Sequence, residues 1–187
     1  MYISMYAVNS WGIYFLKDEK GYSTIEASSM ISISSVCGII GTISCGWISD
    51  KFFKGRRNVP ALVFGVMNVI GLAMFLFIPK GGMLIDSISM VIFGLAIGAL
   101  ICFLGGLMAV DIASKKASGA ALGIIGVASY LGAAIQDLIS GFTIQDSKKV
   151  VDGVTTYDFS SVVWFWLGAA ILSVFLTLLI WNAKAKE

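Results

Sequence analysis

The sequence GWISDKFFKGRR (residues 46–57) joins two long apolar segments, and it decides how the rest of the chain is interpreted. Asp50 falls at the end of the first segment, where a helix dipole disfavours a negative charge. Arg56 and Arg57 follow within reach, across a tight turn that Gly55 permits. Because such charge pairs can form and break when helices move, the stretch predicts a conformational latch. Its residues are Gly46, Asp50, Lys51, Gly55, Arg56 and Arg57.

Apolar segments long enough to cross a bilayer lie on both sides of this stretch. A helix needs about 20 apolar residues to span the hydrocarbon layer. Five segments meet that length: 25–49, 60–79, 87–110, 117–144 and 160–183. Residues 1–16 are also apolar, but at about 1.5 Å per residue they are too short to cross ~30 Å. We therefore expect residues 1–187 to form a single all-α membrane domain whose first helix is truncated.

The composition agrees with a membrane protein and excludes several other classes. Of the 187 residues, 58% are hydrophobic and 13% are charged, whereas soluble domains carry about 25% charged residues. The chain has no histidine, so it offers no imidazole base and no histidine metal ligand. The net charge of +2 is too small to suggest nucleic acid as a partner. We expect no enzyme chemistry, no metal site and no cofactor.

Three cysteines, Cys37, Cys45 and Cys102, lie inside apolar segments without the C-x-x-C spacing of a metal or redox site. Free cysteine is among the most buried residue types and packs as a small hydrophobic side chain. We therefore expect these residues to be buried separately rather than joined in a disulfide.

The distribution of Lys and Arg predicts the orientation in the membrane, because basic residues concentrate on the cytoplasmic side. Eight of them fall on one side of the predicted topology: Lys51, Lys54, Arg56, Arg57, Lys115, Lys116, Lys184 and Lys186. Five fall on the other side: Lys17, Lys20, Lys80, Lys148 and Lys149. We expect the 50–59 loop and the C-terminus in the cytoplasm and the 145–159 loop outside. The alternative interpretation of residues 46–57 is a simple basic anchor on the cytoplasmic side.

Three stretches resemble one known family of membrane proteins. GTISCGWISDKFFKGRRN (41–58) resembles the loop motif of the major facilitator superfamily, and more closely that of its organophosphate:phosphate antiporter family. YAVNSWGIYFL (6–16) is similar to the end of that family's seventh helix. ASKKASGAALGIIGVASYLGAA (113–134) is similar to the loop before its eleventh helix and to much of that helix. The resemblance implies the C-terminal six-helix half of a twelve-helix fold.

The resemblance also implies a function and partners. It suggests that a small organic anion, a sugar phosphate or glycerol 3-phosphate, is exchanged for inorganic phosphate across a bacterial inner membrane. The mechanism would be alternating access, in which two six-helix halves move about a central site. An N-terminal half of six helices and the lipid bilayer would then be the partners. Two alternatives stay open: a membrane sensor of hexose phosphate, and an inactive transporter fragment.

A few polar residues inside the predicted helices are candidates for contact with substrate. Asn9 and Tyr130 are the candidate substrate-binding residues, although a buried tyrosine often serves packing alone. Met5 stands where the family places an arginine that binds the substrate phosphate. Asp137 is expected close to the outer surface, as a polar helix contact rather than a coupling carboxylate.

Small residues recur where helices are expected to meet. Gly94 and Gly98 form one G-x-x-x-G pair, and Gly119 and Gly123 form another. In lipid, small residues let helix backbones approach closely, so both pairs predict tight helix contacts.

Overall fold

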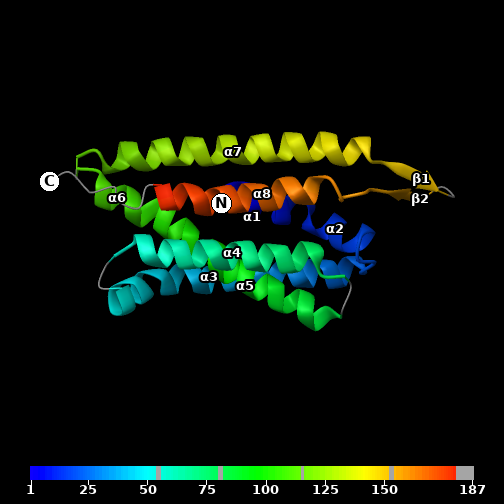
Figure 1. Ribbon diagram of the computed structural model, residues 1–187, viewed down its shortest axis with the longest axis horizontal. Coiled ribbons are helices and arrows are strands. Elements are labelled where there is room, and N and C mark those ends of the chain that lie inside the picture. The colour runs from blue at the N-terminus through cyan, green and yellow to red at the C-terminus, as the bar shows by residue number, and fades with distance from the viewer. Residues whose placement is uncertain (54–55, 80–81, 115, 152–153, 180–187) are drawn as a thin grey trace.

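The computed structural model describes residues 1–53, 56–79, 82–114, 116–151 and 154–179. Nearly all of the described chain is helical, which confirms the all-α fold class (Figure 1). The elements in chain order are α1 (Tyr2–Tyr6), η1 (Ala7–Trp11), α2 (Gly12–Asp18), α3 (Thr24–Phe53), α4 (Asn58–Phe77), α5 (Met83–Cys102), η2 (Phe103–Leu107), α6 (Met108–Ile112), α7 (Ser118–Asp146), β1 (Lys149–Val151), β2 (Val154–Thr156) and α8 (Val162–Leu179).

Five of the described helices are long and apolar enough to cross a membrane. They are Thr24–Phe53, Asn58–Phe77, Met83–Asp111, Ser118–Asp146 and Val162–Leu179. The third combines α5 and α6 through the π-helical turn η2. The first helix combines α1, η1 and α2 in the same way and is shorter. Several helices extend past the apolar segments, because polar end residues can stay helical outside the hydrocarbon layer.

Figure 1 shows α3, α4 and α5 packed together on one side and α7 at the opposite edge. The first helix and α8 lie between them. The first helix packs on α7 through α1 and on α3 through α2, while α4 also contacts α8. The buried core runs along the first helix, where Leu16, Phe75 and Trp166 are among the fully buried side chains.

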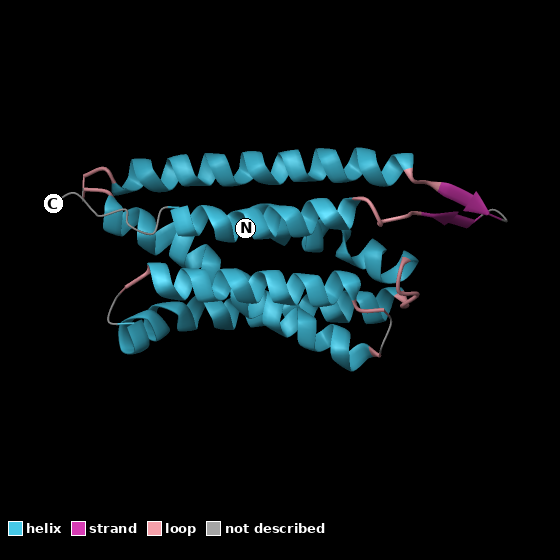
Figure 2. Ribbon diagram, in the orientation of Figure 1, coloured by secondary structure: helices cyan, strands magenta, loops and turns pink. Residues whose placement is uncertain are grey.

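The segment between α7 and α8 contains the only strands among the described residues, which form a short antiparallel hairpin. Strand β1 pairs with β2, with Lys149 opposite Thr156 and Val151 opposite Val154. Figure 2 shows the hairpin projecting beyond the ends of the helices. It therefore lies in water rather than in the hydrocarbon layer.

The glycine pair in α5 makes the close helix contact that the sequence predicts. A Cβ atom at Gly94 would overlap the backbone of Ser34, and one at Gly98 would overlap the backbone of Gly38. The Thr42 hydroxyl donates a hydrogen bond to the Gly98 carbonyl at 3.0 Å across the same contact. The pair at Gly119 and Gly123 makes no such contact, since no described atom lies within 4 Å of a Cβ built at either glycine.

The same contact changes the interpretation of two cysteines. The structure joins Cys45 of α3 and Cys102 of α5 in a disulfide, so the expectation that all three cysteines are separate is wrong for this pair. The glycine-lined crossing brings their Cα atoms to 6.8 Å, within the range that a disulfide spans. Sequence spacing could not reveal this, because the two residues lie on different helices. Cys37 is free.

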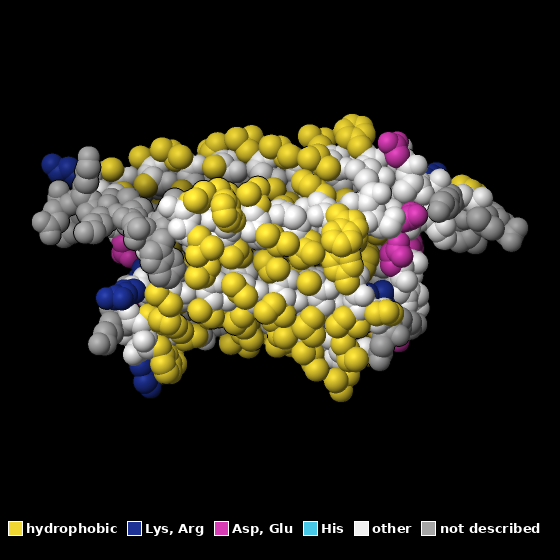
Figure 3. Space-filling model, viewed as in Figure 1, with side chains coloured by type: hydrophobic (Ala, Val, Ile, Leu, Met, Phe, Trp, Pro, Cys, Tyr) yellow, Lys and Arg dark blue, Asp and Glu magenta, His cyan; other side chains and the backbone are white. Residues whose placement is uncertain are grey.

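The surface has the pattern of a protein placed across a membrane. Figure 3 shows hydrophobic side chains over the middle of the visible face, with most of the Lys and Arg side chains at one end. That end carries the connection between α3 and α4 and the connection between α6 and α7. The arrangement is the one expected if these connections face the cytoplasm.

The orientation predicts a difference in chemical labelling on intact cells. Arg56 lies at the basic end and Val150 in the hairpin at the other end, and both are exposed. A single cysteine introduced at Val150 should react with a membrane-impermeant maleimide, and one at Arg56 should react only after the cells are opened. The Cys-to-Ser background of the native cysteines serves as the control. Labelling at position 56 but not at position 150 on intact cells would reverse the orientation.

Candidate functional site

The residues of the predicted latch lie together at the basic end of the molecule. Arg57 donates to Asp50 from Nη1 at 2.9 Å, which is the ion pair that the sequence suggested. The Arg57 Nε also donates to Asp111 at the end of α6, at 3.3 Å. One guanidinium therefore connects the ends of α3 and α6 with the start of α4. Sequence analysis missed Asp111 because its segment carries no motif of its own.

The neighbouring residues of the motif have separate roles. The Ser49 hydroxyl donates to the Arg56 carbonyl at 3.3 Å and so ties the end of α3 to the following turn. The Lys51 ammonium lies 4.5 Å from the centre of the Trp47 ring, a cation–π contact. Gly46 has no described atom within 4 Å of a Cβ built on it. Gly55 lies outside the described residues, and the latch as a device stays a prediction.

A second charge cluster, absent from the sequence predictions, lies at the opposite end. The Lys20 ammonium contacts Asp86 of α5 at 2.5 Å, and the Tyr22 hydroxyl donates to the other carboxylate oxygen at 2.7 Å. Lys20 and Asp86 are 5% and 1% exposed, so the pair is buried. Burial, together with the hydrogen bond to Asp86, raises the pKa of Tyr22 to about 12, so the phenol remains a donor at neutral pH. We name Lys20, Tyr22 and Asp86 the outer cluster.

The residues just before the outer cluster hold the start of α8. Asp18 accepts a hydrogen bond from the Tyr157 backbone N–H at 3.2 Å, and Glu19 accepts one from the Phe159 N–H at 2.8 Å. The connection after the first helix therefore binds α5 on one side and the segment before α8 on the other. The sequence placed Lys17 and Lys20 among the basic residues on the outer side of the membrane. It did not predict that this short polar segment contacts α5 and the residues before α8.

The first helix is locally widened where its polar residues lie. The π-helical turn η1 contains Asn9 and Ser10, which are both exposed. Turns of this kind occur often at functional sites. Asn9 lines a cavity of about 330 Å³ between the first helix, α3 and α5, and Met5 lines the same cavity one turn earlier. A longer side chain at position 5, such as arginine, would therefore extend into this cavity.

Tyr130 lies elsewhere, in a group of three tyrosines. Its ring contacts Tyr2 at 6.2 Å and Tyr6 at 6.5 Å between centroids. Tyr130 is 64% exposed, so its hydroxyl is available to a bound molecule. The structure thus places Asn9 and Tyr130 in different surroundings along the first helix, and their role as substrate ligands stays a prediction.

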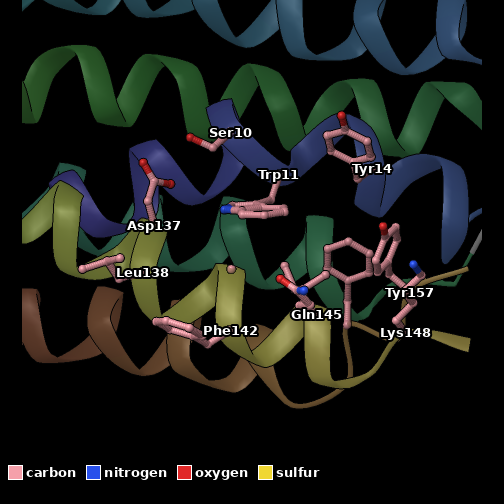
Figure 4. A pocket seen from close by; sticks show the side chains of 12 residues that line it. Ser10, Trp11, Tyr14, Asp137, Leu138, Phe142, Gln145, Lys148 and Tyr157 are labelled. Carbon is pink, nitrogen blue, oxygen red and sulfur yellow. The ribbon is translucent and has the colours of Figure 1, made fainter.

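A larger pocket of about 740 Å³ lies between the first helix and α7 (Figure 4). Ser10, Trp11 and Tyr14 line it from the first helix, and Asp137 and Phe142 line it from α7. Asp137 is nine residues before the end of α7, about 13 Å along the axis at ~1.5 Å per residue. It makes no polar helix contact through Oδ1, which has no hydrogen-bond partner among the described residues.

The structure has five long helices, a widened first helix and a charge cluster at each end. A comparison of the sequence with known families agrees with this arrangement. The sequence profile of the Major Facilitator Superfamily matches residues 1–136. This chain belongs to the major facilitator superfamily.

Several proteins of known name within the superfamily are similar to this chain. The chain is 35% identical over 145 residues to the glycerol-3-phosphate transporter of Bacillus subtilis, with 77% of the chain and 32% of that protein covered. It is 27% identical to the membrane sensor protein UhpC of Salmonella typhimurium, with 100% of the chain and 40% of that protein covered. It is 29% identical to a probable hexose phosphate transport protein of Chlamydia trachomatis, over 100% of the chain and 39% of that protein.

These matches fit the sequence interpretation at the level of family and location. The chain spans about 40% of the length of the second and third relatives, and those alignments cover all of it. The predicted resemblance to glycerol 3-phosphate and hexose phosphate transporters and to a related membrane sensor is confirmed. The predicted multi-pass location in a bacterial inner membrane is confirmed as well.

Proposed function

We propose that this superfamily member forms the C-terminal half of a transporter that exchanges a small organic phosphate for inorganic phosphate. The substrate would be a sugar phosphate or glycerol 3-phosphate, and the mechanism would be alternating access between two halves. The observation that supports the proposal most is that the whole chain aligns with a probable hexose phosphate transport protein and with the membrane sensor protein UhpC. An N-terminal half of six helices would complete the molecule.

The distribution of buried residues supports a missing partner surface. In α5, 56% of the residues in the most apolar window are buried, whereas the value is 17% in α3 and 6% in α7. Small and polar residues also mark these two helices, including Gly119, Gly123 and Ser32, whose presence is unusual on a surface that faces only lipid. A second half would cover these exposed faces of α3 and α7, which lie on both sides of the first helix.

The two charge clusters support movement of the halves. Asp50 and Asp111 are 67% and 53% exposed, while the Arg57 that joins them is 20% exposed. Exposed ion pairs contribute only about 0–1 kcal/mol each, so the cytoplasmic latch can open at small cost. The buried pair in the outer cluster is far harder to separate. The cytoplasmic end is therefore the end at which we expect rearrangement within this half.

A membrane sensor of hexose phosphate is the second candidate function, favoured by the full-length match to UhpC. The two functions differ in one measurement. A transporter carries labelled hexose 6-phosphate into vesicles preloaded with phosphate, and a sensor binds it without carrying it. Vesicles that contain the chain paired with an N-terminal half are the sample for this test. Binding without uptake would support the sensor. The absence of both binding and uptake would support an inactive fragment.

Replacing Met5 by arginine should strengthen the binding of organic phosphates. A phosphate in a poorly solvated cavity needs a fixed cation, and methionine supplies none. A hydrogen bond to a charged group contributes about 1.5–3 kcal/mol, so we expect the half-saturation concentration of hexose 6-phosphate to fall by tenfold or more. The matched control is Met5→Gln, which adds a neutral donor of similar length. Equal exchange in all three proteins would show that no phosphate ligand is needed at this position.

A further inference from the structure

The pocket between the first helix and α7 contains two buried polar atoms that the protein does not pair. They are Nε1 of Trp11 and Oδ1 of Asp137, and neither has a hydrogen-bond partner among the described residues. Both residues line the same pocket of about 740 Å³. Figure 4 shows the indole nitrogen, the Asp137 carboxylate and the Ser10 hydroxyl facing the same part of it. Because a buried polar atom without a partner is costly, the pair indicates a place for a bound group that supplies both bonds.

The two atoms are of opposite type, and this restricts what can bind. The indole N–H can only donate a hydrogen bond, and a carboxylate can only accept one. A phosphate oxygen could accept from Trp11 but would be repelled by Asp137. A cation could pair with Asp137 but would leave the indole N–H unpaired. A group that both accepts and donates satisfies both atoms at once, which a water molecule does in the absence of substrate and an alcohol hydroxyl does when it displaces that water.

The part of the pocket around Trp11 and Asp137 suits a polyol rather than a single alcohol, while Gln145 and Lys148 line the same pocket away from Asp137 (Figure 4). Gly141 lies beside the Trp11 ring, since a Cβ built there would be 3.8 Å from Cζ2 of the indole, so the ring can lie against α7. Leu138 and Phe142 supply apolar walls, against which the C–H faces of a sugar can pack. Ser10 adds a hydroxyl that both donates and accepts.

The neighbouring polar residue of α7 is used differently. Gln136 is fully buried, and its Nε2 donates to Ser140 at 2.9 Å. Ser140 also accepts a hydrogen bond from Trp166 of α8 at 2.8 Å. Gln136 thus belongs to the contact between α7 and α8, which makes it a helix-pairing residue. The Oε1 of Gln136 also has no hydrogen-bond partner among the described residues, but Gln136 does not line this pocket. Asp137, one position later, does line it.

The separation between Asp137 and the tyrosine group is short enough for one substrate molecule to contact both. Tyr130 and Asp137 are seven residues apart on α7, so they lie on the same face, about 10 Å apart along the axis at ~1.5 Å per residue. Tyr6 lies beside Tyr130 on the first helix, one turn before Ser10. A phosphate near the tyrosine hydroxyls would therefore leave the carbon chain of the same molecule extending toward Trp11 and Asp137.

We propose that Trp11 and Asp137 form a hydroxyl-binding subsite that holds the polyol end of the transported organic phosphate. The subsite rests on the proposed function. It also assigns the orientation of the bound substrate, whose phosphate lies away from Asp137. The negative charge of Asp137 keeps inorganic phosphate out of the subsite. Trp11 and Asp137 therefore determine preference for the organic substrate, while inorganic phosphate binds without them.

The test measures the ratio of half-saturation concentrations for hexose 6-phosphate and inorganic phosphate. The protein is this chain paired with an N-terminal half, studied both by exchange in vesicles and by equilibrium binding in detergent. Trp11→Phe removes the N–H and keeps the ring, and Asp137→Leu removes the acceptor and keeps the size. Each should raise the ratio by about five- to tenfold, the effect of losing a hydrogen bond to a buried partner. Asp137→Asn keeps an acceptor but loses the charge that repels phosphate, so its ratio should fall between those of the parent and Asp137→Leu.

The matched control is Trp164→Phe, since Trp164 is 65% exposed on α8 and packs on Phe77 outside this pocket. It should leave the ratio unchanged. An unchanged ratio in Trp11→Phe and Asp137→Leu would overturn the subsite, and so would an equal weakening of both substrates. If the ratio changes in binding while no protein carries substrate, the transport proposal fails and the subsite stands. If neither substrate binds to the parent protein, both proposals fail.

Discussion

Replacing Asp86 by leucine is expected to lower the free energy of unfolding by about 3–5 kcal/mol, because it leaves the Lys20 ammonium buried without a counter-charge. The same change removes the acceptor of the Tyr22 hydroxyl. Thermal unfolding of the purified protein in detergent, followed by circular dichroism, measures the effect. The variant should lose helical signal at a clearly lower temperature than the parent.

The control for Asp86→Leu is the double variant with Lys20→Met. Replacing both members of a buried ion pair by apolar residues is often neutral or stabilising, so the double variant should recover most of the lost stability. The rings of Phe15 and Phe75, which now lie 5.9 and 5.3 Å from the Lys20 ammonium, would pack against the methionine. Equal unfolding temperatures for the parent and Asp86→Leu would show that the pair is not buried in the folded protein.

Replacing Gly98 by valine should have a comparable effect through packing. A side chain there would overlap the backbone of Gly38, and backbone atoms cannot move aside as a flexible side chain can. Overpacking usually costs about 1–3 kcal/mol and occasionally more, and we expect the upper part of that range or beyond. Separation of α3 and α5 would also break the hydrogen bond from Thr42 to the Gly98 carbonyl. The measurement is the fraction of monodisperse protein after extraction, together with its unfolding temperature.

Gly168→Val in α8 is the matched control for Gly98→Val. It makes the same change in a membrane helix, but no described atom lies within 4 Å of a Cβ built at Gly168. This control should behave as the parent does. Similar losses for the two variants would mean that valine is harmful in these helices wherever it stands, and that the crossing of α3 and α5 is not the cause.

The fold was predictable from the sequence because its signals are local. Long apolar segments define helices in lipid, and the G-x-x-x-G pair at Gly94 and Gly98 marked a contact that the structure contains. The Asp50 and Arg57 pair was also predictable, since the two residues face each other across one turn.

Contacts between segments far apart in the chain were not predictable in this way. Asp111 pairs with Arg57, and Lys20 pairs with Asp86, across 54 and 66 positions of sequence. The disulfide between Cys45 and Cys102 depends on a helix crossing that no spacing rule records. Charged residues in connecting segments look alike in a sequence whether they are solvated or buried. Only the contacts of Lys20 with α5 and of Glu19 with the residue before α8 distinguish them.

The candidate site was predictable only in part. Asn9 lines a cavity and Tyr130 is exposed, and the role of both as substrate ligands stays a prediction. The pocket around Trp11 was not foreseen, because tryptophan near a helix end is usually an interfacial residue. The π-helical turn, which brings Ser10 and Trp11 to the pocket, has no clear sequence signature.

If this chain is one half of an organic phosphate exchanger, it should exchange phosphate in vesicles only when an N-terminal half is present. Vesicles loaded with labelled inorganic phosphate would contain this chain paired with an N-terminal half, this chain alone, or no protein. External hexose 6-phosphate or glycerol 3-phosphate should release the label from the paired vesicles. The chain alone should release no more than empty vesicles, because half of the substrate site is absent. Release by the chain alone, or no release by the pair at normal protein levels, would contradict the account.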